Sequence, residues 1–180
     1  TASRWPAKTL LQAIDRYERE ITPTKRSITF ERVVFGLMRR DYPDLCAKVL
    51  NSITPADIGA WRDRRLQTVS GSTVLRYTNL LRHVWTIAAK EWGWCPPESP
   101  WKMVKLPQHN APRDRLIGWR EARSILRRLN YISGLQPVSK MQMVAYAWLI
   151  GLRSALRASE ILSLTPASIN GQVVTLAHHK

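Results

Sequence analysis

The sequence predicts a mainly α-helical protein with a small amount of β-structure near its end. Apolar residues recur with helical spacing through most of the first hundred residues. A stretch with five prolines, 95–115, then interrupts the pattern, and helical spacing returns after it. The run QVVTLA at 172–177 is rich in residues that favour strands. These observations predict one helical domain, an extended connector and a second, partly β domain.

The first domain is expected to contain four or five helices. Thr54 has the features of a helix start, because a proline follows it and an aspartate stands three residues later. The longest helix is expected to begin at Ser70 or Ser72 and to end at Gly93. The amphipathic segments are 7–21, 28–42, 44–53, 54–67 and 70–94.

After the connector, three further helical segments are expected before the strand. Residues 118–132 form the first, and 139–155 form a mostly buried second helix. The segment 155–164 is amphipathic, and we expect Ser154 and Ala155 to form the turn before it. No partner strand is visible for 172–177. Together with the first residue being Thr, this predicts that the chain is a fragment or a processed product.

The charge favours a polyanionic partner. The chain has 28 Lys and Arg against 13 Asp and Glu, and arginine, which binds phosphate in a bidentate manner, outnumbers lysine. The excess is present on both sides of the connector. Nucleic acid is therefore the predicted partner, with an anionic membrane surface or an acidic protein as alternatives.

Other features exclude several classes of protein. The longest apolar run, 141–152, is too short to span a bilayer, and no signal peptide pattern is present. Cys46 and Cys95 have neither metal-site nor disulfide-framework spacing, which fits a reduced, cytoplasmic compartment. His178 and His179 are adjacent on the expected strand and would point to opposite faces. We expect no metal site and no cofactor.

Two segments resemble the tyrosine recombinases of the phage-integrase family. Residues 154–164, SALRASEILSL, resemble the pattern T-G-x-R-x-S-E-[LI]-x-x-L around the family's first catalytic arginine, with Ser154 and Ala155 as departures. Residues 72–94, followed by Pro at a short distance, resemble the closing helix of the family's core-binding domain. The resemblance covers roughly residues 8–180.

The resemblance implies a fold and an activity. It implies a SAM-like helical core-binding domain over 1–95, a linker over 96–113 and a truncated α+β catalytic domain over 114–180. The parent protein would be a bacterial or phage-derived enzyme that cleaves and rejoins double-stranded DNA through a 3′-phosphotyrosyl intermediate, as a tetramer on DNA. A DNA-binding module without chemistry, such as a transcription regulator, is the alternative.

Within this resemblance, Arg157 binds the scissile phosphate and Lys180 acts as the general acid. The alternative for Arg157 is an ion pair with Glu160 that only stabilises a helix. Arg153 does not match the motif, because Ser159 and Glu160 stand at the required spacing from Arg157. The family's His-x-x-Arg motif is absent, and every tyrosine precedes Arg157. The chain by itself is therefore predicted to be inactive.

The core-binding domain would clamp duplex DNA through its phosphates. Residues at the start of the long helix are favoured because helix N-termini attract anions. Trp92, Trp94 and Trp101 are expected to pack the end of the domain rather than stack on bases. The candidate DNA contacts are Lys25, Arg26, Arg62, Arg64, Arg65, Ser72, Thr73, Arg76, Arg113 and Arg115.

Overall fold

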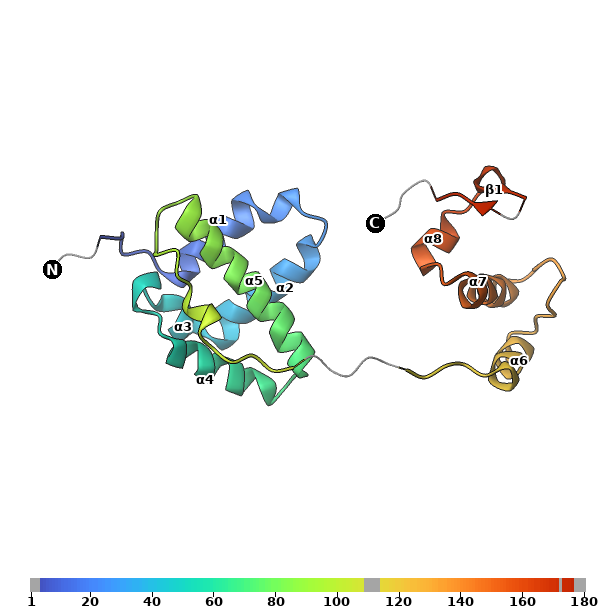
Figure 1. Ribbon diagram of the computed structural model, residues 1–180, viewed down its shortest axis with the longest axis horizontal. Helices are drawn as coiled ribbons and strands as arrows, with labels where there is room; N and C mark the ends of the chain where they lie inside the picture. Colours follow the sequence, from blue (N-terminus) through green and yellow to red (C-terminus); the bar gives the residue numbers. More distant parts are fainter. Residues whose placement is uncertain (1–3, 109–113, 172, 177–180) are drawn as a thin grey trace. The chain divides into compact units, whose positions relative to one another are not determined.

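The computed structural model describes residues 4–108, 114–171 and 173–176. It divides the chain into two compact units, Thr1–Pro112 and Arg113–Lys180. In the described residues, eight α-helices accompany a single two-stranded sheet, which confirms the predicted mainly α fold class (Figure 1). None of the described helices is long and apolar enough to cross a membrane.

The first unit is a bundle in which α5 packs against both α1 and α4. Its core contains buried side chains from all five helices and from the segments that follow α3 and α5. The helices are α1 (Leu10–Glu20), α2 (Ile28–Asp41), α3 (Pro43–Ala47), α4 (Pro55–Leu66) and α5 (Gly71–Lys90). Short 3-10 turns lie at Thr22–Thr24, Leu50–Ser52 and Pro100–Lys102.

The helix ends follow local sequence signals. Thr54 and Asp57 form the predicted capping box, in which each side chain accepts a hydrogen bond from the other residue's backbone N–H. Ser70 is the N-cap of α5. Gly93, just beyond the end of α5, adopts φ of +62°, a conformation that glycine reaches without strain.

The proline-dense stretch is not an extended connector throughout, because its first half packs on the first unit. Trp101 is fully buried, and its ring lies 5.4 Å from that of Trp61. The carbonyl of Pro96 accepts a hydrogen bond of 3.0 Å from the indole N–H of Trp85. Further along, Pro107 lies against Gly71, where an added Cβ would be 3.0 Å from the proline ring. The proline content predicted the irregular backbone, but not these long-range contacts.

Within its described residues, the second unit contains three α-helices and two paired strands. The helices are α6 (Trp119–Arg128), α7 (Lys140–Ser154) and α8 (Ala158–Leu162), and the strands are β1 (Ile169–Asn170) and β2 (Val173–Val174). The strands pair antiparallel, with Ile169 opposite Val174. The β-rich run therefore has a partner strand, contrary to our expectation. An unpaired strand no longer supports the prediction that the chain is a fragment.

Two further expectations for this unit are corrected. Helix α7 is not mostly buried: Ala145 and Leu149 are its buried residues, while Met143 is 55% exposed. Helix α8 is shorter than the predicted 155–164, because Ala155 takes a left-handed conformation and ends α7. The predicted turn between the two helices is thus present, and α8 begins only after Arg157.

Candidate nucleic-acid interface and candidate catalytic arginine

Arg157 stands at the N-cap position of α8, with its side chain 64% exposed. Its Nη1 donates to Glu160 Oε1 at 2.8 Å, and its backbone N–H donates to Glu160 Oε2 at 2.8 Å. The Glu160 side chain is only 11% exposed, so one nearly buried carboxylate both caps α8 and orients the guanidinium. The ion pair that was the alternative interpretation is therefore present.

This pair does not remove the capacity of Arg157 to bind an anion. A guanidinium has five N–H donors, and Glu160 engages one of its nitrogens. Its remaining donors can approach two oxygens of a phosphate in one plane. Arg157 is open to solvent, because within the described residues nothing covers this side of α8.

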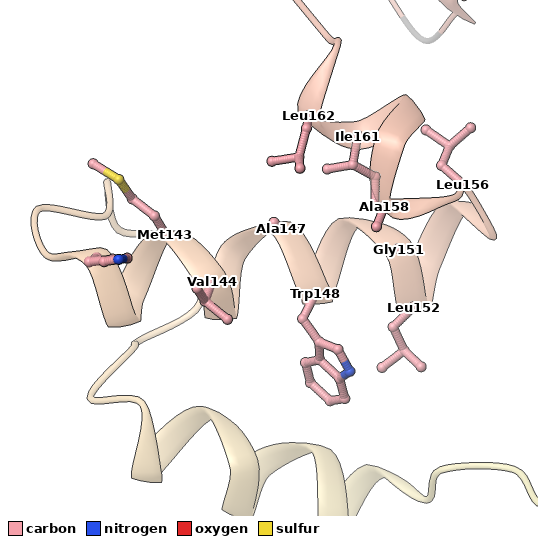
Figure 2. Close-up of a pocket in the computed structure, with 11 residues that line it drawn as sticks. Met143, Val144, Ala147, Trp148, Gly151, Leu152, Leu156, Ala158, Ile161 and Leu162 are labelled. Carbon is pink, nitrogen blue, oxygen red and sulfur yellow. The ribbon is translucent and has the colours of Figure 1, made fainter. Parts of the chain in front are cut away.

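A glycine sets the distance between the two helices that flank Arg157. Helix α8 lies across α7 at Gly151, where an added Cβ would be 3.1 Å from Ile161 Cδ1. Ile161 and Leu162 extend from α8 toward α7, and together with Val144 they line an apolar groove of about 530 Å³ (Figure 2). Apolar packing of Ile161 against Gly151 therefore holds the turn that carries Arg157 against α7.

Arg153 occupies a different environment. It lies in the last turn of α7 and lines a separate cavity of about 830 Å³ with Tyr131 and Gln136. It forms no ion pair with any described residue. The left-handed Ala155 separates it from Arg157, so the two arginines do not share one helix face.

Three predicted DNA contacts form ion pairs with acidic side chains. The Lys25 ammonium donates to Glu31 at 3.0 Å and to the Tyr17 hydroxyl. The Arg62 guanidinium binds Asp63 and the carbonyl of Lys105. Arg115 pairs with Glu121 at 2.6 Å. Two other predicted residues, Arg113 and Lys180, lie outside the described residues.

The remaining candidates lie on and between α2, α4 and α5. Arg26 is exposed just before α2, and Arg64 is exposed on α4. Arg76 is exposed on α5, and Arg65 is partly exposed at the end of α4. No ion pair involves these four arginines among the described residues. Ser72 and Thr73 lie in the first turn of α5, and the Thr73 hydroxyl is 3.1 Å from that of Ser70.

The structure also identifies aromatic residues that sequence reasoning missed. Arg65 lies over the ring of Tyr77, and Arg76 lies over that of Phe30. No spacing in the sequence signals these contacts, because they join residues of different helices.

No cluster of three or more metal-binding side chains occurs in the described part of the chain.

A polar network joins the buried Tyr17 to the exposed His83, and we expect it to make the stability of the first unit depend on pH. The Tyr17 hydroxyl is 2.6 Å from His83 Nδ1 and also accepts from Lys25. Partial desolvation of the ring, reinforced by the Lys25 charge, lowers the pKa of His83, against the weaker opposite effects of Glu31 and Glu91.

Acidification should therefore destabilise the first unit through His83. The unfolded chain binds a proton at the ordinary histidine pKa of about 6.5, whereas the folded chain binds it only at lower pH. The contribution to unfolding free energy is complete above about pH 6.5 and is lost as pH falls through the folded pKa. Urea unfolding between about pH 7.5 and about pH 5.5 measures this slope. His83→Gln should flatten it, and an unchanged slope in that variant would contradict the assignment.

Comparison with known proteins finds three similar integrases or recombinases. A protein of Haemophilus influenzae named as an integrase/recombinase is 36% identical over 92% of this chain and 44% of its own length. A second protein of that organism with the same name is 29% identical over 87% of this chain and 50% of its own length. A shufflon-specific DNA recombinase of Escherichia coli is 28% identical over 86% of this chain and 40% of its own length.

The chain spans about half the length of these curated relatives, or somewhat less. No sequence profile of a protein family matches it, and no solved structure matches it. Because it covers 92% of this chain, the similarity to the first of these proteins runs through both units and includes residues 154–164. These similarities support the tyrosine recombinase/integrase family for this chain.

Proposed function

We propose that this chain is the DNA-gripping and phosphate-binding part of a site-specific DNA recombinase. The observation that carries the proposal is the exposed guanidinium of Arg157, which Glu160 orients at the start of α8 within an intact R-x-S-E-I-x-x-L motif. A guanidinium in that position supplies the planar fork that a phosphodiester requires.

In the proposed reaction, a tyrosine outside this chain attacks the scissile phosphorus, and the 5′-hydroxyl of the DNA leaves. Arg157 binds the non-bridging oxygens and stabilises the charge that grows on them. Lys180 gives the leaving oxygen its proton. Because this chain holds no tyrosine after Arg157, it binds DNA without forming a covalent adduct. The complete enzyme works as a tetramer on double-stranded DNA.

The first unit, a SAM-like core-binding domain, supplies most of the grip on DNA. The arginines that form no ion pair with a described residue, Arg26, Arg64, Arg65 and Arg76, make phosphate contacts, supported by Ser72 and Thr73 at the N-terminus of α5. Lys25, Arg62 and Arg115 contribute less, because carboxylates or a carbonyl already bind them.

Salt dependence of duplex DNA binding tests this proposal. With about five phosphate contacts, each contributing a slope of about −0.9, raising salt from about 50 to about 200 mM should lower affinity about 10²–10³-fold. Fluorescence anisotropy with a labelled duplex measures this, and single-stranded DNA should not compete better than duplex. Nearly salt-independent binding would contradict the proposal.

A matched pair of variants locates the contacts. Arg76→Ala should reduce the magnitude of the salt slope by about 0.9, because it removes an unpaired cation from the proposed interface. Arg40→Ala removes a cation that is also exposed but is paired with Asp41, and it should leave the slope nearly unchanged. Equal effects of the two substitutions would show that only net charge matters.

A further inference from the structure

Two arginines of the first unit stack on the two ends of an aromatic pair. The guanidinium of Arg65 lies 5.4 Å from the ring centre of Tyr77, and that of Arg76 lies 5.3 Å from the ring centre of Phe30. The two rings lie 6.0 Å apart with an angle of 43° between their planes. Helices α2, α4 and α5 are thus joined by one continuous row of cation–π and ring contacts.

Burial differs between the inside and the ends of this row. Tyr77 is 9% exposed and belongs to the core of the unit, and Phe30 is half-buried and packs against that core. Arg76 is exposed and Arg65 is partly exposed. The rings are therefore held by the fold. The Arg76 guanidinium lies at the surface, whereas Arg65 reaches the surface only in part and its Nε is buried.

The hydrogen-bonding capacity of both guanidinium groups is largely unused. Neither arginine forms an ion pair with a described residue, and Arg65 Nη1 donates only to the Thr68 hydroxyl, at 3.1 Å. By contrast, Arg39 binds both Asp15 and Glu18. Stacking occupies the face of a guanidinium and leaves the N–H groups at its edge available, which a planar cation permits and an ammonium does not.

We propose that Phe30 and Tyr77 are positioning residues for DNA binding, which hold Arg65 and Arg76 in place before the phosphates arrive. The inference rests on the proposed function and identifies the surface between α2, α4 and α5 as its phosphate-contacting face. A side chain that is already ordered loses less conformational freedom when it is immobilised by a ligand, so its contact contributes more to affinity. Phe30 acts through Arg76 and itself touches no DNA.

The test is a double-mutant cycle on the 180-residue chain, with duplex DNA affinity as the readout. Phe30→Leu keeps the net charge and removes the ring face, and it should weaken binding about 3- to 10-fold. Arg76→Lys keeps the charge and removes the planar stack, and it should weaken binding by a similar factor. The double variant should lose little more than either single variant, because both substitutions break the same contact. Phe30→Tyr, which retains the ring, should bind like the unchanged chain.

A second stacked arginine provides the control. Arg16 lies 4.6 Å from the ring centre of Trp92, but its Nε is also 2.9 Å from a Glu20 carboxylate oxygen. Trp92→Leu should therefore change duplex affinity by less than about twofold. An equal loss in this variant, or additive losses in the cycle, would overturn the inference.

Circular dichroism checks that each variant is folded. If Phe30→Leu does not fold, Arg76→Lys decides, and a loss below about twofold in that variant overturns the inference. The proposed function fails separately, if the unchanged chain shows no salt-dependent binding to duplex DNA.

Discussion

Replacing Arg157 by alanine in a complete recombinase that contains this chain should lower single-turnover DNA cleavage by at least about 10²–10³-fold. That range is the usual cost of one charge-stabilising donor, and a guanidinium supplies more than one. DNA affinity should change little, because many other cations of the chain also bind the DNA phosphates. Cleavage of a labelled duplex at matched DNA occupancy measures the effect.

Arg153→Ala is the matched control, since it removes the same group four residues earlier from a separate cavity. We expect it to retain most of the cleavage activity. The thermal stability of both variants should be compared, because Arg157 also binds Glu160, which caps α8. If Arg153→Ala loses more activity than Arg157→Ala at equal stability, the catalytic assignment is wrong.

Replacing Trp101 by alanine should lower the unfolding free energy of the first unit by about 3–5 kcal/mol. Trp101 is fully buried and packs edge-to-face on Trp61, so its loss leaves a cavity that the surrounding helices fill only in part. For a domain of this size, the loss should lower the melting temperature by at least about 12 °C. Calorimetry or thermal circular dichroism measures the change.

Met103 lies in the same segment but is 77% exposed, which makes Met103→Ala the control. Its effect should stay within about 0.5 kcal/mol. If Trp101→Ala were equally neutral, the first unit would end near Cys95, and the whole stretch 96–113 would be a linker as the sequence predicts. A large effect of Trp101→Ala instead assigns residues up to Val104 to the first unit.

Signals between residues a few positions apart were sufficient to predict most helix positions from the sequence. The capping box of Thr54 and Asp57 predicted the start of α4, and the glycine at 93 predicted the end of α5. The turn before α8 was predicted as well. Such signals are readable because they act within one turn of the chain, where the sequence itself supplies both partners.

Within the candidate site, the sequence by itself indicated Arg157 as the candidate phosphate-binding residue, because the arginine motif depends on residue type and spacing. Only the tertiary structure decided its environment, since the exposure of a side chain depends on what else packs around it. Lys25 illustrates the same limit. Nothing in the residues around Lys25 distinguishes it from a free surface cation, but the fold brings its ammonium group to the buried carboxylate of Glu31.

The net charge, the helical periodicity and the arginine motif were therefore determined by the sequence alone, because each is a property of residue type and local order. The burial of Trp101 and the stacking of Arg65 and Arg76 on an aromatic pair were decided only by the tertiary structure. These contacts join residues of different helices or loops, and chain spacing carries no information about which surfaces will meet. Their energies come from apolar burial and cation–π attraction, which exist only after the helices have packed.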